Sequence, residues 1–232
     1  MCSHGSMDAI LRELKQSGFV QVRDHLQNPL VVHAVAGAGK TTLLRKLASS
    51  TDLVIHSAAY ASGNNLSGNL IQIHNPSVTP DILDEYLLVQ GYKASKLLIA
   101  DPLQYSTKPP LAHFVKEETH RFGQATCDLL NSLLGIKVKS DRTDTVVIER
   151  FFQGEPEGTI IAFGDEAYNL ITSHHLSPLR PCEAYGLSFP TVTVAFESEP
   201  SSYPPHLVYL ALSRHTEKLI ILSDALASAA GS

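Results

Sequence analysis

The stretch LVVHAVAGAGKTTLLRKLASS, residues 30–50, decides the fold of this chain. An apolar run leads into a glycine-bearing turn, and apolar residues at helical spacing follow Lys40. Gly37 and Gly39 permit positive φ, so backbone N–H groups can close around phosphate oxygens. A strand, a glycine turn, a lysine and a helix in this order are typical of a phosphate-binding loop, and they predict that a nucleotide binds here.

The loop fits the Walker A pattern with one departure, because Ala34 stands where the first glycine is usual. We expect Lys40 to reach the β- and γ-phosphates and the Thr41 hydroxyl to ligate Mg²⁺. The following helix would point its positive end at the same anion. A chance glycine turn is the alternative, and the flanking strand and helix weigh against it. The expected nucleotide site consists of Ala36, Gly37, Ala38, Gly39, Lys40, Thr41 and Thr42.

The composition is that of an ordinary globular protein. The 232 residues are 44% apolar and 18% charged, which excludes wholesale disorder and allows one large domain or two small ones. The formal charge of −5 excludes a basic nucleic-acid coat, so contact with a phosphate backbone would require a local basic patch.

Cysteine content and apolar run length bear on the cellular compartment. Three scattered cysteines are too few for a disulfide framework and fit a reducing compartment. No apolar run approaches the roughly 18 residues that span a bilayer, and the N-terminus lacks the pattern of a signal peptide. We therefore expect a soluble, intracellular protein without direct membrane insertion.

Short apolar, β-branched runs alternate with longer amphipathic ones, which is typical of an α/β fold with a parallel sheet. The expected strands are residues 30–35, 53–57, 96–101, 145–151, 159–163, 191–196 and 218–222. The expected helices are residues 8–16, 41–49, 124–134 and 166–173.

Two proline-bearing stretches interrupt this order. Residues 105–114 are the expected domain boundary, which gives domains of residues 7–113 and 114–232, and residues 197–206 are expected to form a surface loop. Residues 1–6 resemble a cloning scar and are left out of the expected fold.

Three acidic stretches compete to complete a magnesium site. Asp101 follows one apolar run, Asp165 and Glu166 follow another, and Asp84 and Glu85 follow only a short apolar pair. The local pattern favours Asp165 and Glu166. Acids at strand ends are common, however, so the pattern alone leaves the choice open.

A set of motifs in order decides more than the local pattern does. AVAGAGKT, LDEY, IADPLQY, HRFG, YGLSFPTVTV and LALSRHTEKLIIL resemble motifs I to VI of the alphavirus-like superfamily 1 viral RNA helicases. The small size resembles the first triple gene block movement proteins of potexviruses, carlaviruses and related plant viruses. The resemblance implies two RecA-like parallel-sheet lobes that use ATP or another NTP with Mg²⁺. It also implies RNA-helicase-like activity, cell-to-cell movement of the viral genome and suppression of host RNA silencing.

Carried over by position, the resemblance makes LDEY the metal motif. Asp84 would hold Mg²⁺, and Glu85 would act as general base on the attacking water. Asp101 would lie near the metal and Gln104 would sense the γ-phosphate, although Ala100 departs from the usual glycine. The alternative for Asp84 and Glu85 is a helix start with two solvated acids.

Residues 164–166 then become a strand-to-helix turn with Asp165 near an N-cap.

HRFG places Arg121, and LSRH places Arg214, where the family carries arginines that stabilise charge on the transferring phosphoryl group. Arginine suits this role because of its permanent charge and its bidentate fork. The alternative for each is a surface arginine in a weak ion pair.

Contacts to RNA are expected from two further segments. The motif V segment offers Gly186, Ser188 and Thr191, and the segment after the second expected strand offers Ser57 and Tyr60. An ordinary core strand or loop is the alternative for both segments. His174, His175 and Cys182 invite a zinc site, but a fourth ligand at suitable spacing is missing.

The leading hypothesis is an ATP-fuelled motor that binds single-stranded viral RNA. The alternatives are a scaffolding movement protein that uses NTP binding as a switch, and a small nucleoside or metabolite kinase. The resemblance implies self-association and contact with the other triple gene block proteins and the viral coat protein. It implies a location in the host cytoplasm, with plasmodesmata or inclusion bodies reached through partners.

Overall fold

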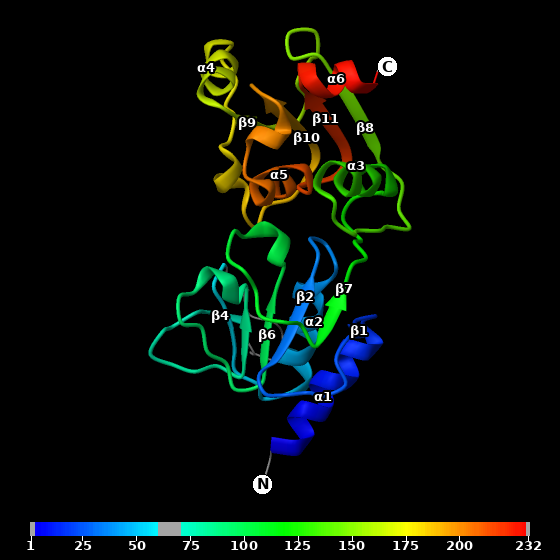
Figure 1. Cartoon of the computed structure of the whole chain (residues 1–232). Helices are drawn as coiled ribbons and strands as arrows, with labels where there is room; N and C mark the ends of the chain where they lie inside the picture. The colour runs from blue at the N-terminus through cyan, green and yellow to red at the C-terminus, as the bar shows by residue number, and fades with distance from the viewer. Residues whose placement is uncertain (1–2, 60–70, 231–232) are drawn as a thin grey trace. The chain divides into compact units, whose positions relative to one another are not determined.

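The computed structural model describes residues 3–59 and 71–230. The chain divides into two compact units, Met1–Glu118 and Thr119–Ser232. In the colours of Figure 1 the first unit runs from blue to green and the second from green to red. Each unit has its own sheet of mainly parallel strands with helices packed against it, so the expected α/β class is confirmed.

The first unit is built on a sheet with the strand order β1-β7-β2-β6-β5-β3-β4. Its strands pair in parallel, apart from β1, which runs antiparallel to β7. The strands are β1 Val20–Gln21, β2 Leu30–Ala34, β3 Ile55–Ser57, β4 Ile71–Ile73, β5 Ile82–Asp84, β6 Leu97–Ala100 and β7 Phe114–Lys116. The inner strands β2, β5 and β6 are almost fully buried, as expected of parallel strands that are covered on both faces.

Among the described residues of this unit are the α-helices α1 (Ser3–Gln16) and α2 (Lys40–Ser50), which pack against each other. The helix expected over residues 8–16 reaches back to Ser3 in the structure, so residues 3–6 extend α1 instead of lying outside the fold. The expected boundary also shifts, because β7 lies beyond residue 113 but pairs with β2 of the first sheet. The division therefore follows Glu118.

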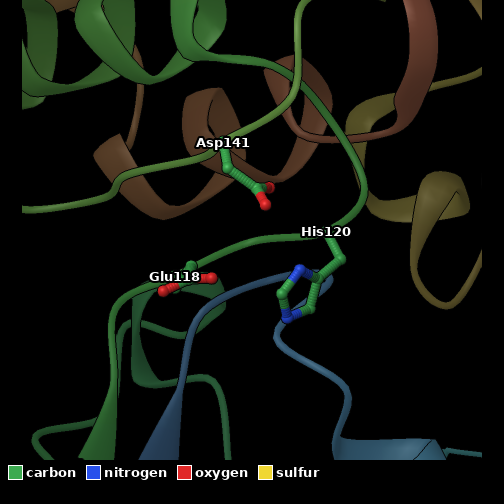
Figure 2. Close-up of side chains that lie close together, drawn as sticks. All are labelled: Glu118, His120 and Asp141. Carbon is green, nitrogen blue, oxygen red and sulfur yellow. The ribbon is translucent and has the colours of Figure 1, made fainter. Parts of the chain in front are cut away.

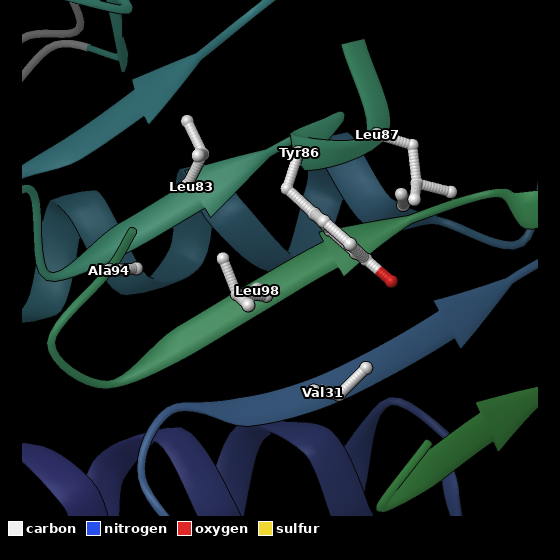
Figure 3. Packing of buried hydrophobic residues seen from close by; sticks show 7 residues of the cluster. Val31, Leu83, Tyr86, Leu87, Ala94 and Leu98 are labelled. Carbon is white, nitrogen blue, oxygen red and sulfur yellow. The ribbon is translucent and has the colours of Figure 1, made fainter. Parts of the chain in front are cut away.

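A buried cluster joins strands β2, β6 and β5 of the first sheet. It contains Val31, Leu83, Tyr86, Leu87, Ala94, Leu98 and Ala100. Figure 3 shows Tyr86, at the end of β5, reaching across β6 toward β2. There its hydroxyl lies 2.9 Å from Nε2 of His33. Burial lowers the pKa of His33 to about 4, so this ring is neutral and the contact is a hydrogen bond between uncharged groups.

The second unit has a parallel sheet with the order β8-β11-β10-β9. The strands are β8 Thr145–Glu149, β9 Thr159–Phe163, β10 Phe189–Phe196 and β11 His215–Leu222. The helices are α3 Gln124–Leu134, α4 Asp165–Ser173, α5 Pro205–Leu212 and α6 Asp224–Ala230. Helix α5 begins where the expected surface loop ends. Residues 208–212 of α5 are all buried. A helix that is buried on every side is apolar all round, so its sequence shows no alternation of apolar and polar residues at helical spacing.

A buried polar network joins α3, the start of β8 and β11. Asp144 Oδ2 accepts hydrogen bonds from Thr126 Oγ1 at 2.6 Å and from His215 Nε2 at 3.0 Å. The side chains of Asp144 and His215 are both fully buried. Burial alone would raise the pKa of Asp144, but bonds from His215, Thr126 and the Gly123 backbone outweigh it and hold this pKa at about 2.

We predict that Asp144→Asn lowers the free energy of unfolding by about 2 kcal/mol at pH 7, because the buried carboxylate that accepts hydrogen bonds from His215 and Thr126 is lost. The folded pKa lies below the ordinary value, so the stabilisation is present above pH 4 and is lost as the pH falls toward 2. Urea denaturation should therefore show a difference between wild type and Asp144→Asn that shrinks to roughly half near pH 3. Asp128→Asn, at an exposed position of α3, is the matched control and should change stability little. If the difference in unfolding free energy between wild type and Asp144→Asn does not vary with pH, the low pKa of Asp144 is wrong.

Candidate nucleotide site

The phosphate-binding loop lies between β2 and α2. Strand β2 ends at Ala34, and helix α2 begins at Lys40 after a loop that contains both glycines. Gly37 and Gly39 have φ of 76° and 93°, in the left-handed region that glycine adopts at low cost. Because Gly39 is the N-cap of α2, no capping side chain covers the first N–H groups of the helix, which are the groups that bind phosphate.

Asp84 lies at the end of β5, two strands from the loop in the sheet order. Its side chain is buried, and Oδ2 accepts a hydrogen bond of 3.1 Å from Ser57 Oγ on β3. Burial raises the pKa of Asp84, the neighbouring Glu85 raises it further, and Lys40 opposes them. Asp84 is therefore a buried carboxylate at the end of a strand. It is not a solvated acid at the start of a helix, which was the alternative.

The second oxygen of Asp84, Oδ1, is buried and accepts no hydrogen bond from any described residue. A buried carboxylate oxygen in this state is unfavourable unless a cation lies against it. Oxygen ligands from a carboxylate and a hydroxyl are also what Mg²⁺ prefers. The residues present therefore fit a magnesium ion held by Asp84 and the Thr41 hydroxyl.

Glu85 follows Asp84 and lies beside Lys40. Its Oε1 is 3.7 Å from Lys40 Nζ, and its Oε2 accepts a hydrogen bond of 2.8 Å from the Tyr105 hydroxyl. Lys40 Nζ also lies 3.3 Å from the Ala34 carbonyl oxygen at the end of β2. The structure thus brings Lys40 close to Asp84 and Glu85, which are more than forty positions away in sequence, although β6 separates β2 from β5 in the sheet.

Asp101 and Gln104 lie after β6, between the phosphate loop and Asp84 in the sheet order. Both side chains are buried. Asp101 Oδ1 caps the short 3₁₀ helix Pro102–Gln104 by accepting from the Leu103 N–H, and Oδ2 accepts from Gln104 Nε2 at 2.7 Å. Asp101 therefore fixes the Gln104 amide.

The second unit brings its two predicted arginines to one residue, Ser213. Arg121 Nη1 donates to the Ser213 carbonyl oxygen at 3.2 Å, and Arg214 Nη2 donates to the Ser213 hydroxyl at 3.1 Å. Arg214 also donates to the Leu187 carbonyl oxygen and is only 1% exposed. A surface ion pair is therefore the wrong alternative for Arg214.

The residues predicted to contact RNA differ in how exposed they are. Ser57 is fully buried and donates to Asp84, so its hydroxyl supports the carboxylate and is not at a surface that RNA could reach. Tyr60 lies outside the described residues. Gly186, with φ of 74°, and Ser188 are exposed, whereas Thr191 is partly buried on β10.

Asp165 and Glu166 belong to the second unit and start α4, as expected for a strand-to-helix turn. The N-cap is Gly164, and Asp165 lies 2.8 Å from Arg180 Nη2 as an exposed partner. The first turn is capped from elsewhere, because Glu197 Oε2 accepts from the Glu166 N–H at 2.8 Å. Asp165, an exposed carboxylate that is already paired with Arg180, is therefore a poor magnesium ligand.

His174 and His175 lie at the exposed C-terminal end of α4, and neither joins a group of possible metal ligands among the described residues. Among the described residues, the side chains of Glu118, His120 and Asp141 lie close enough together to form such a group (Figure 2). Glu118 is the last residue of the first unit, whereas His120 and Asp141 belong to the second. We assign no ion to this group.

Tyr105 is the site residue that the sequence does not predict. Its hydroxyl contacts Glu85, which is 20 positions earlier in the chain. The only sequence signal is its place directly after Gln104, and a tyrosine at the edge of a proline-bearing segment reads equally well as a loop residue.

Comparisons with known proteins agree with these motifs. Residues 30–223 match the viral superfamily 1 RNA helicase core domain. The movement and silencing protein TGBp1 of Papaya mosaic potexvirus is 40% identical over 94% of this chain and 95% of its own length. The protein of the same name from Lily virus X is 38% identical over 83% of this chain and 89% of its own length.

Solved structures show the same fold at low identity. The Arterivirus nonstructural protein 10 helicase in complex with DNA superposes with a TM-score of 0.53 at 19% identity, covering 97% of this chain and 59% of that one. The PRRSV helicase superposes with a TM-score of 0.55 at 16% identity, covering 94% of this chain and 55% of that one. This chain thus spans little more than half the length of these helicases. By its motifs and its relatives, the chain belongs to the TGBp1 family of plant-virus movement and silencing proteins, built on the viral superfamily 1 RNA helicase core.

Proposed function

We propose that this chain hydrolyses ATP or another NTP with Mg²⁺ and couples hydrolysis to binding of single-stranded viral RNA. The observation that supports this most directly is the meeting of Lys40 with Glu85 at 3.7 Å, next to the buried carboxylate of Asp84. A lysine, a metal-binding acid and a neighbouring carboxylate are the groups that phosphoanhydride hydrolysis requires.

In this proposal each of the predicted site residues has one task. The loop N–H groups and Lys40 bind the β- and γ-phosphates. Asp84 and Thr41 hold Mg²⁺, which when bound neutralises charge on the phosphate oxygens. Glu85 orients the attacking water and accepts its proton, and Gln104, fixed by Asp101, senses the γ-phosphate. Arg121 and Arg214 stabilise the charge that develops on the transferring phosphoryl group.

The relatives named as movement and silencing proteins support a role in moving viral RNA between cells and suppressing RNA silencing. We propose self-association, and contact with the other triple gene block proteins and the coat protein, in the host cytoplasm. Plasmodesmata or inclusion bodies would be reached through those partners. Among the described helices, none has the length and apolar character of a membrane span.

A second candidate is a scaffolding movement protein in which NTP binding acts as a switch. The formal charge of −5 favours it, because strong RNA binding usually requires more positive surface. RNA then changes the rate of turnover little. Transfer of phosphate to a small acceptor would instead indicate a kinase and would exclude both proposals.

We predict that Lys40→Ala and Asp84→Asn each lower phosphate release from ATP at least about 100-fold, since phosphate and metal binding are lost. Asp165→Ala should retain nearly the wild-type rate, because this acid is exposed in the second unit. Release of inorganic phosphate under saturating ATP is the measurement. Loss of turnover in Asp165→Ala with retention in Asp84→Asn would refute the choice of metal ligand.

We predict that RNA stimulates turnover and that Arg214→Lys lowers kcat about 100-fold while ATP affinity changes less than about threefold. Lysine keeps the charge at this buried position, and a melting curve verifies that the variant folds. Arg150→Ala, at an exposed position of the same unit, is the control and should behave as wild type. Turnover that depends on Lys40 but is the same with and without single-stranded RNA would favour the switch.

A further inference from the structure

Glu85 has an unusual backbone that does not by itself fix its side chain. The residue has φ of 51°, a left-handed conformation that is uncommon for a residue other than glycine. Its N–H donates to the Ile99 carbonyl oxygen of β6 at 2.8 Å, which anchors the backbone to the sheet. The carboxylate, however, lies beyond three rotatable bonds, so its position depends on what contacts its oxygens.

Among the described residues, Lys40 and Tyr105 contact this carboxylate in different ways. Lys40 Nζ lies 3.7 Å from Oε1, which is close enough for an ion pair but too far for a hydrogen bond. The Tyr105 hydroxyl donates to Oε2 at 2.8 Å, which is a directional bond to a charged acceptor. Lys40 must also reach the phosphates in the proposed function, so it is the less constant of the two partners.

The Tyr105 ring is itself held in place. It is partly buried and packs against the cluster of Figure 3, as Tyr92 does. The residue before it is Gln104, whose amide is bound to the buried Asp101. The hydroxyl of Tyr105 is therefore fixed by the packing of its ring and by the 3₁₀ helix that precedes it.

We infer that Tyr105 is a positioning residue that holds the Glu85 carboxylate for its work as general base. The inference rests on the proposed function. One short segment after β6 then carries both the γ-phosphate sensor, Gln104, and the anchor of the base, Tyr105. A displacement of this segment moves both groups together, which links the detection of the γ-phosphate to the placement of the base. An oriented base matters because misplacement by about 1 Å can lower a rate by about 100-fold.

The test is Tyr105→Phe, which removes one oxygen and keeps the ring in the cluster. We expect kcat for ATP to fall about tenfold with KM unchanged, because binding does not use this hydroxyl. Tyr92→Phe is the matched control, since Tyr92 packs against the same cluster, and it should retain wild-type kcat. The melting temperatures of both variants should lie within a few degrees of wild type.

A double-mutant cycle separates positioning from a general structural effect. In a Glu85→Gln background, under single-turnover conditions, Tyr105→Phe should cause no further loss, because the group that it positions is gone. An equal loss in both backgrounds, a wild-type kcat in Tyr105→Phe, or a rise in KM that accounts for the whole effect would each overturn the inference. Wild-type protein without any turnover would instead overturn the proposed function, and the inference with it.

Discussion

The buried carboxylate of Asp84 is the constraint on which the first unit depends. A carboxylate withdrawn from water is stable only with hydrogen bonds or a cation beside it. The register of β3 against β5 sets Ser57 opposite Asp84, which supplies one hydrogen bond. The other oxygen accepts no hydrogen bond from the described residues, and Lys40 at the start of α2 lowers the pKa of the same carboxylate, so a buried anion and the phosphate loop influence each other electrostatically.

The second unit also contains a buried carboxylate, and side chains of the same unit satisfy it by hydrogen bonds. Asp144 is also buried, but His215 and Thr126 satisfy it from within the fold. His215 directly follows Arg214, and Thr126 lies five positions after Arg121. The network therefore holds the two chain segments that carry the arginines, and Ser213 joins the arginines themselves.

Sequence patterns predicted most of the longer elements, but they missed helix α5 and short strands such as β5. The strand–turn–helix around Lys40 and the start of α4 at residue 165 are local features, and they appear as expected. Strand β5 has three residues, too few to show a period, so Asp84 could be identified only by resemblance to a family. The burial of Ser57 was unpredictable for a different reason, since it follows from cross-strand register, which one strand does not encode. Tyr105 depends on a contact across 20 positions, which no local pattern contains.

The left-handed backbone of Glu85 lowers the stability of the fold. Glycine would adopt that conformation freely, whereas glutamate does so at a cost of about 1 kcal/mol. A sequence selected for stability alone would place glycine or asparagine there. A carboxylate at such a position leaves the fold slightly less stable than it could be, and the cost falls on a residue whose carboxylate lies 3.7 Å from Lys40 Nζ.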